Sequence, residues 1–312
     1  MKNLRLKTLS AALLSLGLST SAPAFAEDRA LPTELQVQSE ATESVQLQVD
    51  AKATDQAAEK RQKITAEAVA AVNETKKALT LLDEKKTDEA LAALERATGK
   101  LELILVRDPA LALAPVDVEV VTYDLLAGPD TVKAMIDDAE NYLEDGEVQK
   151  ARPLVANLAS EIVFRTTSIP LGSYPAAIKA ITPLIDDGKL DEAKAGLQAA
   201  LNTLVMTTDE VIPLPVLRAE KLLKNAEALA ENEKRTVKDN ETLAKQLAEA
   251  RSQLKMAQVL GYGTKKSFKP LHQQLDQIEQ KTTGGKGGKC WFDKIVTIQL
   301  KKTVKVLDRV FA

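Results

Sequence analysis

One short phrase occurs three times in this chain of 312 residues, and it limits the folds that the chain can adopt. In the third copy, Ile178, Ile181 and Ile185 share one helical face, and a second apolar face follows Gly188. A glycine at this point can take the positive φ that ends a helix, so each copy predicts a helical hairpin. The copies read LLDEKKTDEALAAL at 81–94, YLEDGEVQKARPL at 142–154 and LIDDGKLDEAKAGL at 184–197.

The second and third copies agree over a long stretch, at positions 42 residues apart. Both continue past the hairpin, through IVFRTT towards Ile169-Pro170 and through LVMTT towards Ile212-Pro213, and we interpret both stretches as the same ending of a second helix. The first copy is looser, because Lys85-Lys86 stands at the turn instead of glycine. The matching apolar positions are Val148, Ala151, Val155, Ala159 and Ile162 in the second copy and Leu190, Ala193, Leu197, Leu201 and Leu204 in the third.

The spacing of the copies predicts an irregular arrangement. It is 61 residues between the first two copies and 42 between the last two, whereas solenoid repeats keep one period. Helical pairs that cannot bury their apolar faces alone are covered by stacked neighbours. We therefore predict an all-α fold, in which residues 53–281 form an irregular helical domain built from duplicated helical hairpins.

The remaining helices follow from apolar periodicity and capping signals. We expect a long helix over about 54–82 and three more over about 216–231, 239–260 and 267–281. Residues 27–52 alternate polar and small side chains without a sustained helical stripe. They are predicted to form a flexible lead-in, with a strand-like LQVQ or VQLQV as the alternative.

Residues 1–26 have the three parts of a secretory signal peptide. MKNLRLK supplies positive charge, residues 9–18 are apolar, and Ala24-Phe25-Ala26 is a small-x-small cleavage site. A membrane anchor would need roughly 20 apolar residues, about twice the length of this run. We expect cleavage after Ala26 and export of the remainder.

Charge is distributed unevenly after the signal peptide. Residues 27–281 carry a net charge of −11, and residues 282–312 carry +5. The acidic body argues against a nucleic-acid partner, since such binding depends on neutralising phosphates. The only cysteine, Cys290, cannot form an intramolecular disulfide, so its thiol is either free or paired between molecules.

The C-terminal segment is predicted to be a tethered basic amphipathic helix over 291–312. A Gly/Lys linker over 282–290 precedes it. Such a helix can lie on an anionic membrane surface, fold back onto the acidic body, or pair with another chain. The candidate membrane or partner contacts are Trp291, Phe292, Lys294, Leu300, Lys301, Lys305, Leu307 and Phe311.

The sequence offers little for catalysis. His272 is the only histidine, which excludes catalytic triads and paired-histidine zinc sites. Acidic pairs such as Asp186-Asp187 lack the ligand spacing of a calcium loop. Lys265 and Lys266 begin a predicted helix after a glycine break, which makes them a candidate anion site. We predict no catalytic residues, metal or cofactor, and a protein that is not an enzyme.

Three segments closely resemble the YfdX family of bacteria. The resemblance covers roughly 59–281 and implies an exported, helical, oligomer-forming protein linked to acid and drug stress, with no agreed catalytic reaction. It supplies no family site that can be placed residue by residue. The segments are ALERATGKLELILVRDPALALAPVDV, the run from ARPLVANLAS to VIPLPVLRAE, and AQVLGYGTKKSFKPLHQQLDQIEQKT.

The leading hypothesis is therefore a periplasmic stress-response protein that acts by binding. It would protect partly unfolded clients, as a chaperone does, or sequester apolar small molecules between its helices, and it is expected to form a homo-oligomer. The alternative is a module that binds a membrane surface or a partner through the basic C-terminal helix.

Overall fold

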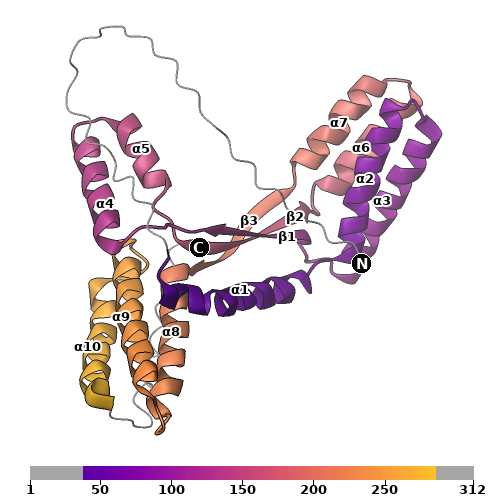
Figure 1. The fold of residues 1–312 in the computed structure, drawn as a ribbon. Helices are drawn as coiled ribbons and strands as arrows, with labels where there is room; N and C mark the ends of the chain where they lie inside the picture. Colours follow the sequence, from indigo (N-terminus) through magenta and orange to yellow (C-terminus); the bar gives the residue numbers. More distant parts are fainter. Residues whose placement is uncertain (1–37, 286–312) are drawn as a thin grey trace, which may run out of the picture. The chain divides into compact units, whose positions relative to one another are not determined.

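The computed structural model describes residues 38–285, which are mostly helical, as the sequence predicts (Figure 1). Within this range the chain forms ten α-helices, three strands and a short 3-10 turn. In order, the elements are α1 Glu40–Arg61, α2 Ala66–Asp83, α3 Thr87–Arg107, β1 Leu113–Tyr123, α4 Pro129–Glu144, α5 Val148–Ala156, β2 Glu161–Pro170, α6 Tyr174–Asp186, α7 Leu190–Asn202, β3 Val205–Pro213, α8 Leu214–Glu231, α9 Val237–Val259, α10 Lys265–Thr282 and the 3-10 turn Thr283–Gly285.

A three-stranded antiparallel sheet in the order β1-β2-β3 is the main departure from the prediction. The stretches that we interpreted as helix endings are β2 and β3. Ile162 is therefore a strand residue, and Leu204 follows the end of α7. The physical reason lies in their β-branched residues, as in IVFRTTSI, which favour a pleated and partly buried surface. Phe164, in the central strand, is fully buried.

Each hairpin is followed by one strand, so the repeat unit is helix–helix–strand. The first unit joins α2 and α3 to β1, the second joins α4 and α5 to β2, and the third joins α6 and α7 to β3. We call the three helical pairs the first, second and third hairpins. The repeated phrase forms the turn between the two helices of each pair.

The three turns have the same geometry, a Schellman motif with one residue in the left-handed conformation. Gly146 and Gly188 both have φ of +74°, and Lys85 takes the same place in the first copy with φ of +60°. One residue later, the backbone N–H reaches back to a carbonyl in the last turn of the helix. These distances are 2.8 Å for Lys86 to Leu81, 2.7 Å for Glu147 to Tyr142 and 2.8 Å for Lys189 to Leu184.

The first and third hairpins bury their apolar faces against each other. Figure 1 shows α2, α3, α6 and α7 side by side, and α3 contacts α6 while α2 contacts α7. Leu82, Leu94, Ile185 and Leu197 belong to the common core of these four helices, and each is at most 3% exposed. Stacking therefore supplies the cover that a single hairpin lacks.

Helix α1 corrects the predicted flexible lead-in, because residues 40–52 of that segment are helical. Val45 and Val49, four residues apart, are buried against other elements: Val45 with the α8–α10 core, and Val49 with Phe164 of the sheet. With so few buried apolar positions, the helix has only a weak sequence signal. The predicted long helix over 54–82 is also interrupted between α1 and α2, over 62–65.

The three helices after β3 agree with the prediction to within a few residues. Helix α9 begins with a capping box between Thr236 and Asp239, and Gly261, at φ +80°, ends the following turn. Their common core includes Leu222, Leu254 and Phe268. Residues 1–37 and 286–312, which contain the predicted signal peptide and the predicted C-terminal helix, lie outside the described range.

Candidate interaction surface

The second hairpin has exposed apolar side chains at positions that are buried in the other two. Three residues before the left-handed turn residue stand Leu82, Leu143 and Ile185, and their exposed fractions are 1%, 50% and 3%. Leu143 is the member that belongs to the second hairpin. The same helical position thus faces a core in two repeats and solvent in one.

A second equivalent position, nine residues after the turn residue, repeats this contrast. Leu94 and Leu197 are 2% and 0% exposed, whereas Val155 of α5 is 53% exposed. Because Ile185 and Leu197 belong to one core, their counterparts Leu143 and Val155 are expected on one face of the second hairpin. Val148, the counterpart of the partly buried Leu190, is 55% exposed. We define the exposed face as Leu143, Val148 and Val155.

The packing of the second hairpin explains this exposure. Helices α4 and α5 pack on each other, and α4 also packs on α9, where Lys255 Nζ lies 2.7 Å from Asp130 Oδ1. Only Val132, Ala139 and Ala151 of this hairpin are buried. Within the described part of the chain, therefore, the exposed face has no counterpart to the cover that the first and third hairpins give each other.

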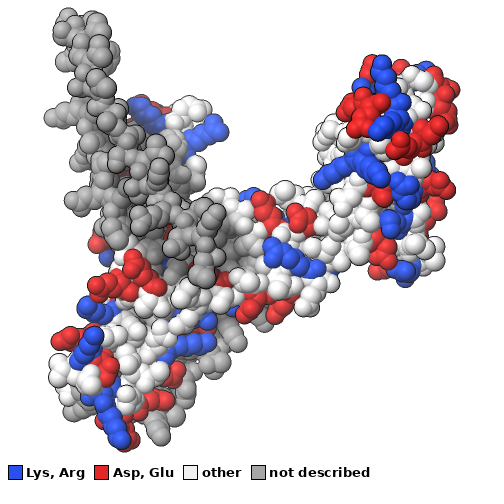
Figure 2. All heavy atoms as spheres, turned by 45° about the vertical axis from the view of Figure 1, so that its right-hand side comes forward, with Lys and Arg blue, Asp and Glu red and all other residues white. Residues whose placement is uncertain are grey.

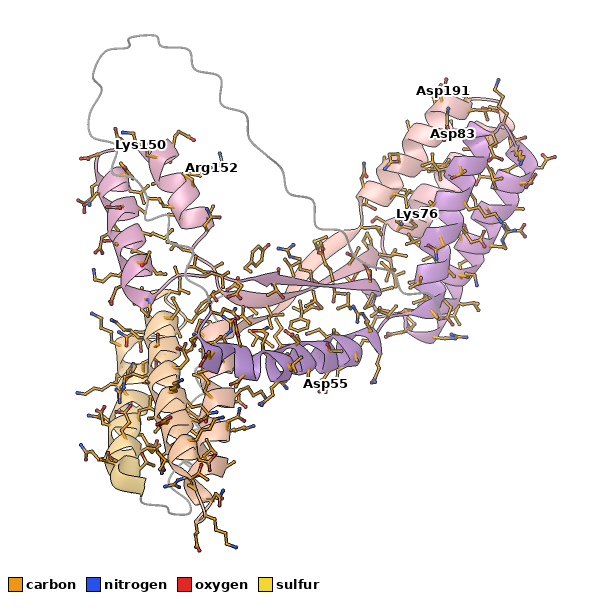
Figure 3. The ribbon with its side chains drawn as sticks, viewed as in Figure 1. Asp55, Lys76, Asp83, Lys150, Arg152 and Asp191 are labelled. Atoms are coloured by element: carbon orange, nitrogen blue, oxygen red, sulfur yellow. The ribbon has the colours of Figure 1, made fainter. Side chains whose placement is uncertain are left out.

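Charged groups border the exposed face. Residues 129–156 contain seven acidic and three basic side chains, a net charge of −4. Lys150 Nζ lies 2.8 Å from Glu147 and also sits over the ring of Tyr142, 5.5 Å from its centroid. The hydrogen bond from Lys150 to Glu147 raises the pKa of Lys150, so this lysine stays charged. Figure 3 shows Lys150 and Arg152 on α5.

Acidic side chains at the turns of the first and third hairpins form surface ion pairs. Lys194 Nζ lies 2.9 Å from Asp191 and 3.5 Å from Asp83, which links the third hairpin to the first. Figure 3 places Asp83 and Asp191 at the same end of the four-helix group, and Figure 2 shows positive and negative side chains intermixed there. Among residues 38–285, no three His, Cys, Asp or Glu side chains gather so that they could hold a metal ion.

The candidate anion site is at the start of α10. Lys265 and Lys266 are exposed, and the Thr264 side chain already accepts the N–H of Ser267, 3.2 Å away. His272 is half-buried on the same helix. Desolvation lowers its pKa, and the positive charge of Arg251 lowers it further.

Sequence reasoning missed a small polar cavity of about 150 Å³ bordered by α1, the loop after β1, α8 and α9. The Arg218 guanidinium, with a side chain only 5% exposed, donates to both carboxylate oxygens of Asp124 at 2.9 and 2.7 Å. Nearby, Tyr262 donates to Glu161 at 2.7 Å and accepts the Ser160 N–H at 2.9 Å. The one available signal was an arginine within the apolar run LPVLRAEKLL.

These groups are suited to holding elements together. The charge of Arg218 is compensated by Asp124, and burial, together with the hydrogen bond to Glu161, raises the pKa of Tyr262 so that its hydroxyl stays protonated. A paired guanidinium and a neutral phenol provide neither a nucleophile nor a general base at neutral pH.

Several predicted site residues lie outside the described range, and their assignments stay predictions. These residues are the cleavage-site Ala24 and Ala26, the single thiol Cys290, and the contact residues Trp291, Phe292, Lys294, Leu300, Lys301, Lys305, Leu307 and Phe311.

No helix within residues 38–285 has the length and apolar character needed to cross a membrane.

The fold defines a mostly helical protein of three helix–helix–strand repeats. Residues 71–210, from α2 to β3, match the sequence model of the YfdX protein family. Among solved structures, it is similar to YfdX of Salmonella Typhi, with 14% identity, a TM-score of 0.33, and coverage of 48% of this chain and 93% of that one. No curated protein matched the chain.

Proposed function

We propose that this protein is a periplasmic, non-enzymatic stress-response protein that binds partly unfolded chains at the exposed face of the second hairpin. The observation that carries the proposal is the exposure of Leu143 and Val155, whose counterparts in both other hairpins are buried. In the first and third hairpins, the equivalent apolar positions are covered because each hairpin packs against the other. A chain that exposes apolar segments is a partner with the matching chemistry.

The size of the exposed face argues for transient binding. Completing the burial of three half-exposed aliphatic side chains contributes on the order of 1 kcal/mol each, because full burial of such a side chain is worth about 1.5–3 kcal/mol. A sum of about 3 kcal/mol falls below the 4.1 kcal/mol of a millimolar complex. Useful affinity then requires several faces acting together, and a homo-oligomer would supply them through avidity.

The acidic border suits a role under acid stress. Carboxylates as a class lose their charge in acid, so the net negative charge that residues 129–156 place around the apolar side chains falls under acid stress. The surface becomes less hydrated at the same pH that unfolds client proteins. We therefore propose that client binding strengthens as the pH falls towards 4.

Light scattering by an aggregating client tests the proposal. The full protein should suppress the aggregation of reduced insulin, and the double variant Leu143→Ser/Val155→Ser should lose most of this activity. The matched control is Leu103→Ser/Val106→Ser on α3, where the side chains are 50% and 78% exposed. Equal loss in both variants, or no suppression by the wild-type protein at pH 7 and at pH 4.5, would refute the proposed function.

A further inference from the structure

We propose that the segment 291–312 of the same chain docks on the exposed face of the second hairpin and competes with clients for it. The inference depends on the proposed function only where it names this face as the client site. Three independent features support the docking: the charge of the hairpins, the apolar pattern of the segment, and the length of the connection.

Charge separates the second hairpin from the other two. Residues 66–107 carry eight acidic and seven basic side chains, and residues 174–202 carry four and three, so each of the mutually packed hairpins has a net charge of −1. The second hairpin carries −4. A second copy of the same hairpin would place like charges together, which opposes association. The cover that suits this face is apolar and positively charged.

Residues 286–312 have this chemistry, with seven basic and two acidic side chains and a net charge of +5. In a helix over 291–312, one side would carry apolar residues and the remainder would carry most of the lysines. Such a helix of 22 residues is about 33 Å long, enough to follow α4, whose 16 residues span about 24 Å. The apolar residues are Phe292, Val296, Leu300, Val304, Leu307 and Phe311.

The connection is long enough to reach. Helix α10 runs beside α9, where Arg251 binds Asp276 at 2.7 Å and Glu279 at 3.0 Å, and α10 ends at Thr282. Lys255, about 6 Å further along α9 by helical rise, binds Asp130 at the start of α4. Residues 283–285 form the 3-10 turn, and the five residues 286–290 beyond it can span up to about 17 Å when extended. They can therefore carry the start of the segment towards the foot of the second hairpin.

Fluorescence of Trp291 tests the docking directly, because it is the only tryptophan in the chain. In the full protein at low salt, we expect a blue-shifted emission and weak acrylamide quenching. The variant Leu143→Asp/Val155→Asp should shift the emission to the red and raise the quenching severalfold. Leu103→Asp/Val106→Asp, with changes of the same kind on the first hairpin, should leave both unchanged.

Three results would overturn the inference: a fully exposed Trp291 in the wild-type protein, a buried Trp291 that ignores the second-hairpin variant, and a signal that depends on protein concentration. The last would assign the cover to the segment of another copy. A Trp291 that becomes buried only when vesicles of anionic phospholipid are added would also contradict it and would assign the segment to a membrane surface.

The variant Leu307→Asp/Phe311→Asp, which disrupts the segment and leaves the face intact, separates this inference from the proposed function. It should expose Trp291 and increase the suppression of insulin aggregation at a given protein concentration. Exposure of Trp291 without any client activity would refute the proposed function alone. The inference alone would be refuted by a different pair of results. In that case client activity depends on Leu143 but is the same in Leu307→Asp/Phe311→Asp as in the wild type, and the fluorescence of Trp291 does not respond to substitutions at the exposed face.

Discussion

Leu143 and Ile185 stand three residues before a left-handed glycine in two successive repeats, yet the side chain of Leu143 is 50% exposed and that of Ile185 is 3% exposed. We predict that Ile185→Ala lowers the free energy of unfolding by about 2–5 kcal/mol, the usual cost of such a truncation in a core. Leu143→Ala should cost about 1 kcal/mol or less. Urea unfolding followed by circular dichroism measures both, and equal costs would contradict the assignment of the cores.

The Arg218–Asp124 pair gives a second prediction. Removing Asp124 leaves a buried guanidinium without its partner, so Asp124→Ala should destabilise the protein by roughly 3 kcal/mol, the lower end of the range for buried pairs. The lower end applies because the Asp124 side chain is 26% exposed. The variant Arg218→Met/Asp124→Leu should recover part of the loss. If the double variant is less stable than Asp124→Ala, the buried guanidinium left without its partner does not explain the loss of stability in Asp124→Ala.

The turn residues allow a test in both directions. A residue with a Cβ in the left-handed region costs about 1–2 kcal/mol relative to glycine, so Gly188→Ala should lower the melting temperature. Lys85→Gly should raise it, because Lys85 already occupies that region at φ +60°. The gain should be about 1 kcal/mol or less, since glycine also loses more chain entropy on folding. Calorimetry of both variants would show opposite shifts, and shifts of the same sign would contradict the equivalence of the turns.

His272 predicts a pH dependence of stability. Burial, and then the charge of Arg251, lowers its pKa in the folded protein below the ordinary value of 6.5. Below that pH the unfolded chain binds the proton more readily than the folded one, so this contribution to stability is present above pH 6.5 and is lost as the pH falls. The variant His272→Gln should lose less stability than the wild type between pH 7.5 and pH 5.5. An identical loss in urea unfolding would show that His272 does not contribute.

The sequence was sufficient to predict the hairpins and the last three helices, because their turns and caps leave local signals. Gly146, Gly188 and Gly261 mark helix ends by their conformation, whatever the distant contacts are. The sheet was missed because the agreement between two copies around Ile162 and Leu204 was interpreted as helical. The β-branched residues of IVFRTTSI were the signal that could have predicted a strand.

The exposed face could not be predicted from the sequence in the same way. Val155 and Leu197 stand at equivalent apolar positions of the second and third copies, and both positions predict burial. Which hairpins pair depends on tertiary packing, which the repeat pattern does not determine. Helix α1 escaped prediction for a related reason, since Val45 and Val49 become buried only against α8–α10 and the sheet.

Photo-crosslinking tests the central claim, that the second hairpin binds clients, most directly. Val148, 55% exposed on α5, is replaced by benzoylphenylalanine, and in a control protein Val106, 78% exposed on α3, is replaced instead. Both are irradiated with reduced insulin B chain. The account predicts an adduct of protein and client for the probe at 148 and little or none at 106. Equal adducts at both positions, or an adduct only at 106, would contradict it.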